Sequence, residues 1–186
     1  TLTGTSAGDN TFNPQLTNST GFVTSLTKSS TGQWNLGNTN NTYTGATAVS
    51  NGILGLNNNG ALPSGSPVVL GSTTTSGILQ MSGTLARNLT TAPTAGTGTI
   101  TWGGTTGGGG FAAHATTLTV TLDGGAGVTW GSGGFVGTGG TQVTTEDKLK
   151  GRDGKPLFET IQADQAAAMW DRESSARPAT SAIGDW

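Results

Sequence analysis

Few residues of this chain could carry out acid–base or metal chemistry. His114 is its one histidine, the chain has no cysteine, and the acidic residue nearest to His114 in the sequence is Asp123. A metal site or a general acid–base pair needs partners within reach, which a lone histidine does not have. A histidine in a loop or at a strand edge is predicted instead, and we expect no metal ion and no cofactor.

Carboxylates and cations are equally sparse over most of the chain. Residues 1–144 carry four charged side chains, Asp9, Lys28, Arg87 and Asp123, whereas residues 145–186 carry fourteen. Enzymes that cleave polysaccharides need clustered acids or bases along one groove, and four charges cannot supply such a cluster. The glycine run 107–110 lacks the Lys-Ser or Lys-Thr and the helix of a phosphate-binding loop. The sequence therefore predicts a protein that is not an enzyme.

Charge and hydropathy argue against two further classes of partner. The net charge of -2 and the pI of about 5.1 give no basic face that could follow a phosphate backbone, so nucleic acid is not expected as a partner. No apolar run approaches the roughly 20 residues that span a bilayer as a helix, so direct membrane insertion is not expected.

Residues 1–144 contain short groups in which apolar and polar residues alternate, as they do in β-strands. Glycines flank most of these groups and supply turn conformations that β-branched residues avoid. Each group is three to five residues long, and they lie at 33–36, 53–56, 68–70, 78–81, 99–102, 118–122 and 128–130.

These groups recur with a loose period. Trp34 and Leu54 are 20 residues apart, Leu54 and Leu79 are 25 apart, and Ile78 and Ile100 are 22 apart. Periods of this length are typical of solenoids, in which successive units stack and pair their strands. A β-sandwich is the alternative for a chain with many short strands.

The residues of the repeat resemble a known family. Ser25-Leu26-Thr27-Lys28 precedes the group 31–36, and Asn41-Thr42-Tyr43-Thr44-Gly45-Ala46-Thr47 and Asn59-Gly60-Ala61-Leu62 follow in order. This order is similar to the autotransporter-associated β-strand repeat, and with the segment 110–136 the likeness covers about residues 1–140. The resemblance implies a right-handed parallel β-helix in an exported passenger, located extracellularly or on the outer cell surface of a Gram-negative-type bacterium.

Residues 145–186 are expected to form a second, different segment. The turn 151–156 ends in a proline suited to open a helix, 157–172 has helix formers on an amphipathic pattern, and 176–186 reads as an extended arm. The segment either caps the last strands of the solenoid or joins it to another subunit. The candidate contact residues are Leu157, Phe158, Ile161, Met169, Trp170, Ile183 and Trp186.

Three tryptophans in the repeat region are candidates for ligand contact. Trp34, Trp102 and Trp130 alternate with polar residues, so each ring either faces the core or forms a platform on which a sugar could stack. We take Trp102 and Trp130 as the candidate glycan contacts.

Together these patterns predict an all-β protein in two parts. Residues 1–144 form a right-handed parallel β-helix, and 145–186 add a short α-helix and an arm. The expected function is structural, as a component of a fibre, a surface layer or an adhesin, with protein partners that are copies of itself or a surface complex. The alternatives are a carbohydrate-binding or carbohydrate-cleaving β-helix, and an accessory subunit attached to a larger complex through its arm.

Overall fold

The computed structural model describes residues 1–104 and 108–136. The predicted C-terminal segment 145–186, with its helix and arm, lies outside the described residues. Over the described ranges the structure is nearly all β, with two parallel sheets and two single-turn 3-10 helices, η1 (Asn59–Ala61) and η2 (Asp123–Gly125). The all-β prediction is confirmed.

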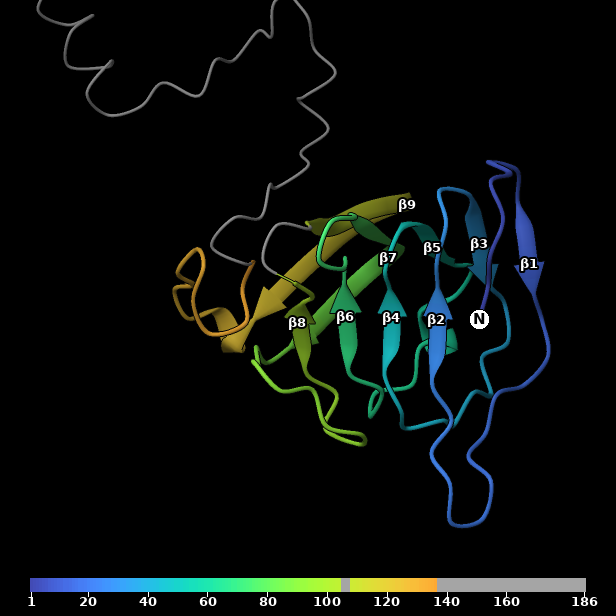
Figure 1. The fold of residues 1–186 in the computed structure, drawn as a ribbon, viewed down its shortest axis with the longest axis horizontal. Helices are drawn as coiled ribbons and strands as arrows, with labels where there is room; N and C mark the ends of the chain where they lie inside the picture. Colours follow the sequence, from blue (N-terminus) through green and yellow to red (C-terminus); the bar gives the residue numbers. More distant parts are fainter. Residues whose placement is uncertain (105–107, 137–186) are drawn as a thin grey trace, which may run out of the picture. The chain divides into compact units, whose positions relative to one another are not determined.

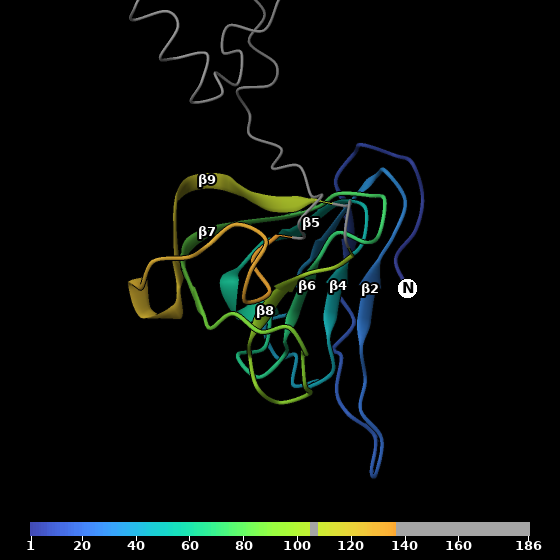
Figure 2. The same ribbon diagram turned by 60° about the vertical axis from the view of Figure 1, so that its left-hand side comes forward.

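The strands fall into two sheets, and the chain alternates between them. Within the described residues one sheet has the order β1-β3-β5-β7-β9 and the other β2-β4-β6-β8, and every pairing is parallel. Parallel neighbours cannot be joined by a tight turn, so a strand of the other sheet always intervenes. Figures 1 and 2 show β2, β4, β6 and β8 side by side as one layer.

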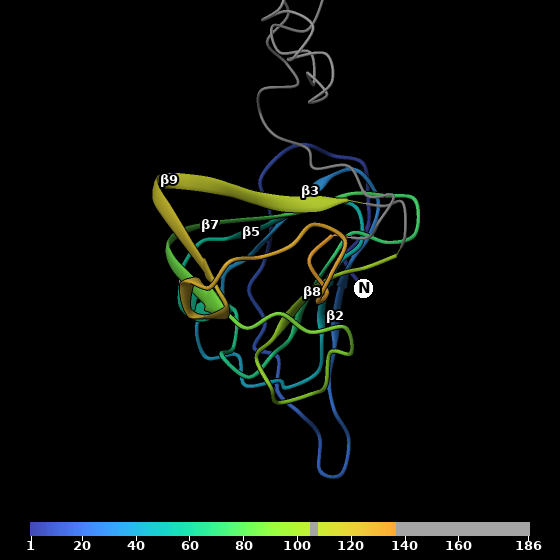
Figure 3. The same cartoon turned by 90° about the vertical axis from the view of Figure 1, so that its left-hand side faces the viewer.

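Strand lengths change along the stack. The larger sheet comprises β1 (Asn10–Phe12), β3 (Gln33–Leu36), β5 (Gly52–Leu56), β7 (Gly77–Arg87) and β9 (Gly109–Leu122). The smaller sheet comprises β2 (Leu26–Lys28), β4 (Thr47–Val49), β6 (Val68–Leu70) and β8 (Ile100–Trp102). Figure 3 shows that β7 and β9, the two longest of these strands, bend sharply, whereas the earlier strands do not.

The pairing register tests the predicted period. Trp34 pairs with Leu54 and Leu54 with Leu79, as predicted. The predicted equivalence of Ile78 and Ile100 is wrong, because Ile100 pairs with Val68 in the smaller sheet. Both isoleucines open an apolar group near a glycine, but successive strands belong to different sheets, so Ile100 cannot continue the row of Ile78.

Two predictions about individual strands are also wrong. β7 and β9 have 11 and 14 residues instead of three to five, because their parallel pairing continues through Ser, Thr, Gly and Ala positions. Their ladder is interrupted between Met81 and Gly83, close to Ala115, whose φ is 61°. The group 128–130 is not a strand, since it lies in a glycine-rich stretch whose one bridge joins Ser132 and Phe135.

The core lies between the two sheets. Alternate residues of each strand point inward, and each fully buried leucine or isoleucine contributes about 1.5–3 kcal/mol. The buried apolar residues of the strands are Leu26, Leu36, Val49, Leu54, Leu56, Val68, Leu70, Leu79, Met81, Leu85, Ile100 and Trp102.

A row of glycines marks the first position of three strands in the larger sheet. Gly52 pairs with Gly77, and Gly77 pairs with Gly109. Here the backbone of one strand approaches that of another element so closely that a side chain cannot fit. A Cβ atom on Gly77 would lie 1.6 Å from the carbonyl oxygen of Val49.

Candidate functional site

The polar residues of the repeat motif lie inside the molecule and bind one another. The Tyr43 hydroxyl is 2.7 Å from Thr47 Oγ1, which is 2.7 Å from Ser66 Oγ, and Ser66 donates to the carbonyl oxygen of Gly45 at 2.8 Å. Tyr43, Thr47 and Ser66 are fully buried. Burial raises the pKa of Tyr43, and its hydrogen bonds to Thr47 and Ser66 oppose that rise. This chain of hydroxyl groups stabilises the interior of the molecule, and its burial leaves no surface for a ligand to bind.

Asn41 has a similar internal role. Its side chain donates to the carbonyl oxygens of Ala61 at 2.8 Å and Asn38 at 2.7 Å, and its Oδ1 accepts from the amide of Leu16 at 2.8 Å. One buried amide therefore ties together three backbone segments that are distant in the sequence. Asparagine suits this position because it offers both donors and an acceptor.

Lys28 is the one charged side chain that the described residues bury completely. Its ammonium donates to the carbonyl oxygens of Ser29 at 3.0 Å, Ser30 at 2.7 Å and Asn51 at 3.0 Å. Three donors meet three acceptors, so the group is satisfied without a carboxylate. Burial lowers the pKa of Lys28. One ammonium group therefore holds together the turn at Ser29 and Ser30 and the turn at Asn51.

One group of hydrogen-bonded polar side chains lies on the outer face of the larger sheet. Gln33 Nε2 donates to Asn35 Oδ1 at 3.2 Å and to Gln80 Oε1 at 3.5 Å, and Asn35 Nδ2 donates to Asp9 Oδ1 at 3.4 Å. Gly55 pairs with both Asn35 and Gln80. We call Asp9, Gln33, Asn35 and Gln80 the amide row.

The amide row has the chemistry of a weak sugar site. Amide side chains can both donate to and accept from sugar hydroxyls, and the Asp9 carboxylate can accept from them. The mutual hydrogen bonds of these side chains, at 3.2, 3.4 and 3.5 Å, are as long as or longer than ordinary N–H···O bonds. Asn35 is buried by its neighbours, whereas Asp9 is exposed and Gln33 and Gln80 are half-buried. A ligand would have to replace the bonds that these side chains make with one another.

The two predicted glycan contacts meet in one aromatic cluster. Trp102 packs edge-on against Phe111 and Phe135, at centroid distances of 5.9 and 5.0 Å, and Trp130 packs edge-on against Phe135 at 5.9 Å. Trp102 is 7% exposed and its indole donates to the carbonyl oxygen of Gly109, while Trp130 is 45% exposed. Of the two rings, Trp130 is the one with a free surface.

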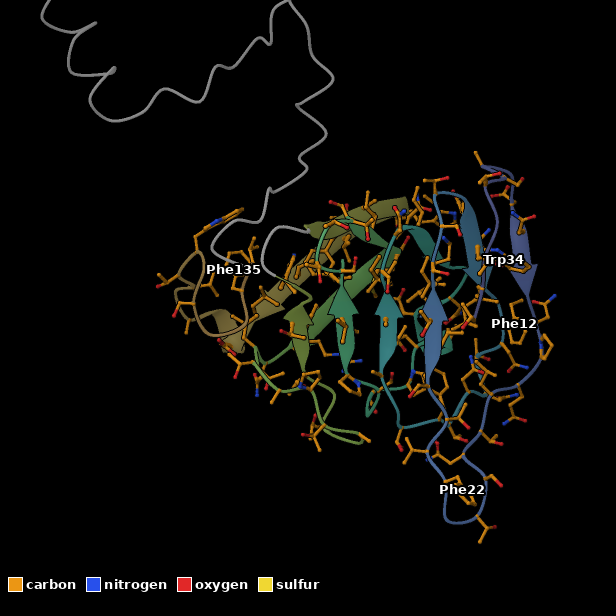
Figure 4. The ribbon with its side chains drawn as sticks, viewed as in Figure 1. Phe12, Phe22, Trp34 and Phe135 are labelled. Atoms are coloured by element: carbon orange, nitrogen blue, oxygen red, sulfur yellow. The ribbon has the colours of Figure 1, made fainter. Side chains whose placement is uncertain are left out.

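Trp34 lies at the other end of the sheets, near Phe12 (Figure 4). Its indole donates to the carbonyl oxygen of Thr3 at 2.8 Å, and its ring is half-buried against the core. The ring therefore has a packing role.

A loop between β1 and β2 carries a second exposed apolar group. Phe22 and Val23 are 76% and 56% exposed, and Figure 4 shows Phe22 at the tip of a loop that extends away from the sheets. The base of the loop is fixed by Asn18, whose Oδ1 accepts from the amides of Thr24 and Thr44. No sequence pattern predicted this loop tip, and only the exposure of its two apolar side chains identifies it as a candidate contact.

The candidates for acid–base chemistry are dispersed. His114 is half-buried on β9, and Asp123 accepts from the amide of Leu89 at 2.7 Å. Asp9 precedes β1 and Asp123 follows β9, so the two carboxylates lie at opposite edges of a sheet whose strands are about 4.8 Å apart. Residues 1–104 and 108–136 contain no cluster of three or more His, Cys, Asp or Glu side chains that could hold a metal ion.

The predicted assembly residues lie outside the described residues. They are Leu157, Phe158, Ile161, Met169, Trp170, Ile183 and Trp186. In the part of the chain that the structure describes, no helix is long and apolar enough to cross a membrane.

Sequence reasoning missed the amide row and the role of Lys28. The row joins residues that are up to 47 positions apart, so only the register of β3 and β7 brings them together. The one signal in the sequence was the alternation of Gln33 and Asn35 with apolar residues, which places both on the polar face of a strand. Comparison with family models, with curated proteins and with solved structures gave no match for this chain.

Proposed function

We propose that residues 1–144 form a parallel β-solenoid, right-handed as in the repeat family that the sequence resembles, in a non-enzymatic extracellular structural protein. The observation that supports this proposal most is the alternation of parallel strands between two sheets, with one register kept from β3 through β5 to β7. Such a stack provides length and stiffness with few side chains left for chemistry. A component of a fibre, a surface layer or an adhesin needs these properties.

The internal positions of the polar motif residues support the same proposal. Lys28, Asn41, Tyr43 and Thr47 make hydrogen bonds within the interior, so the motif serves architecture. A family motif that built an active site would direct such groups toward a cleft. The resemblance to the autotransporter-associated repeat adds the proposed location, outside the cell or on its outer surface.

The segment 145–186 is proposed to cap the solenoid or to join it to another subunit. Deletion of 145–186 tests this, with circular dichroism, light scattering and electron microscopy as the measurements. A joint predicts that the truncated chain keeps its β-type spectrum and loses its polymers or complexes. A cap predicts that the truncated chain loses thermal stability. A matched control replaces Glu159 and Asp164 with serine, because the predicted helical pattern puts both opposite its apolar residues, and this change should alter neither property.

The location is tested on intact cells that produce the protein. A surface component is cleaved by added protease before the cells lyse, whereas an internal protein is protected until lysis. Protection in intact cells, together with a soluble monomer in solution, would refute the proposal.

The second candidate function is carbohydrate binding, and the amide row and Trp130 favour it. Amide side chains can hydrogen bond to sugar hydroxyls and an exposed indole can stack on a sugar ring, and groups of both kinds have access to solvent here. Binding of oligosaccharides should disappear on Gln80→Ala or Trp130→Ala and survive His114→Ala. The described residues do not support carbohydrate cleavage, because that reaction needs two carboxylates within about 10 Å of each other, and Asp9 and Asp123 lie at opposite edges of the larger sheet.

A further inference from the structure

The turn before β5 holds an asparagine and a glycine in an unusual arrangement. The amide nitrogen of Gly52 donates to the side-chain Oδ1 of the preceding Asn51 at 2.8 Å. The glycine has a φ of 69°, a conformation that a residue with a side chain rarely adopts. The backbone nitrogen therefore already lies against the side-chain amide of its neighbour.

A cation lies on the other side of the same peptide group. The Lys28 ammonium donates to the carbonyl oxygen of Asn51 at 3.0 Å. When a peptide nitrogen loses its proton, the negative charge spreads onto the oxygen of that peptide group. A fixed ammonium at that oxygen stabilises the anion, in the same way that an oxyanion hole stabilises developing charge.

We propose that Asn51 is a site of spontaneous deamidation that Lys28 promotes. Gly52 N loses its proton to water or hydroxide and attacks Cγ of Asn51, forming an N–Cγ bond. The Cγ–Nδ2 bond then breaks, ammonia leaves with the proton it needs, and a five-membered succinimide remains. Water opens this ring at either carbonyl and leaves aspartate or isoaspartate. The net change is one water consumed and one ammonia released, without oxidation or reduction.

The chain contains a second Asn-Gly pair that serves as an internal control. Gly60 N donates at 2.9 Å to Oδ1 of Asn58, and not to that of Asn59, the residue directly before it. The Asn59 side chain donates to the carbonyl oxygen of Ser82, and the Asn59 carbonyl accepts from the neutral amide of Leu62 at 3.3 Å. Asn59 thus lacks both the attack geometry and the cation.

The reaction would alter a tightly packed turn. A Cβ atom on Gly52 would lie 2.5 Å from the carbonyl oxygens of both Ser30 and Gly32, so the backbone has little room to move. Isoaspartate adds a methylene group to the main chain here and displaces the carbonyl that Lys28 binds. Aged protein should therefore be less stable than fresh protein.

The test begins with the unmodified full-length chain. It is incubated near neutral pH below its unfolding temperature, and peptides are mapped by mass spectrometry with an isoaspartate assay. We expect Asn51 to deamidate at least about tenfold faster than Asn59, and the ratio to fall to about one when the chain is unfolded in denaturant. A folded-state ratio of one or less, or no reaction at Asn51, overturns the proposal.

A variant isolates the contribution of Lys28. In Lys28→Met, provided that its circular dichroism matches the parent, deamidation at Asn51 should slow by about tenfold or more while Asn59 is unchanged. An unchanged rate at Asn51 in the folded variant refutes the role of the lysine. If the variant does not fold, the comparison of folded and unfolded parent protein tests whether the folded turn with its lysine accelerates deamidation at Asn51, and a ratio near one in the folded state overturns the proposal.

Discussion

Replacement of Gly77 by alanine tests the close approach of the start of β7, in the larger sheet, to the end of β4, in the smaller sheet. The added Cβ would lie 1.6 Å from the carbonyl oxygen of Val49 and 2.5 Å from its carbonyl carbon, whereas real Cβ atoms essentially never come within 3.0 Å of such atoms. The opposing atoms are backbone, so they cannot rotate away as a side chain would. Either β7 or the end of β4 has to move.

The magnitude follows from what that movement breaks. The Val49 carbonyl accepts from the amide of Gly71 at 2.8 Å, and a lost buried hydrogen bond costs about 0.5–1.5 kcal/mol. Strain from overpacking adds about 1–3 kcal/mol. The free energy of unfolding of Gly77→Ala should therefore fall by about 2–4 kcal/mol, which corresponds to a decrease in Tm of roughly 6–12 °C for a domain of this size.

The assay is thermal and urea unfolding monitored by circular dichroism, with Gly127→Ala as the matched control. A Cβ on Gly127 has no other atom within 4 Å, and its φ is not in the left-handed region. This control should be neutral, or stabilised by a few tenths of a kcal/mol through the unfolded state. Equal stability of Gly77→Ala and Gly127→Ala would refute the close approach of Gly77 to the backbone of Val49.

Three further substitutions test the interior and the surface. Lys28→Met should lower the free energy of unfolding by about 2–4 kcal/mol, because three carbonyl oxygens lose their donor, and urea unfolding measures this. Tyr43→Phe should cost about 1 kcal/mol near neutral pH. Because burial raises the folded-state pKa of Tyr43, its contribution is fully present below pH 10.0, the ordinary value, and is lost as pH rises through the folded-state pKa. In alkali, the free energy of unfolding of the parent should therefore fall more with rising pH than that of Tyr43→Phe. Identical pH profiles of the two proteins would contradict the burial of this hydroxyl. Phe22→Ser should change the free energy of unfolding by less than about 0.5 kcal/mol, since the ring is 76% exposed, and a larger loss in thermal unfolding would mean that the loop tip is packed.

Short groups of apolar and polar residues predicted β3, β5 and β6 in the middle of the chain, but β4, between β3 and β5, was not among the predicted groups. Gln33 to Leu36 and the group after Gly52 form β3 and β5, in the register that their spacing predicted. The same reasoning missed the length of β7 and β9, because Ser82 and the threonines of β9 are equally common in loops. Their extended conformation depends on a partner strand, and no local pattern encodes that partner.

The buried lysine illustrates the limit for individual sites. A lysine in a strand is ordinarily expected at the surface, because burial of an unpaired charge is costly. Lys28 is buried because three carbonyl oxygens converge on it, and one of them, from Asn51, comes from 23 residues away. The amide row depends on long-range register in the same way. The direction of Trp102 was likewise left open by its alternation with polar residues, and the structure buries the ring in the core.

The regular register of the smaller sheet has a consequence for how this molecule can change over evolutionary time. Leu26, Thr47 and Val68 occupy one row at intervals of 21 residues, and Gln33, Ile53 and Ile78 occupy one row of the larger sheet. Excision of 47–67 would bring Val68 opposite Leu26 and Ile78 opposite Gln33, so each remaining strand would keep a parallel partner. Unequal recombination between such units can therefore lengthen or shorten the gene while strand pairing is kept. The hydrogen bonds that cross the excised segment, such as those of Lys28 with Asn51 and of Asn41 with Ala61, then need new partners.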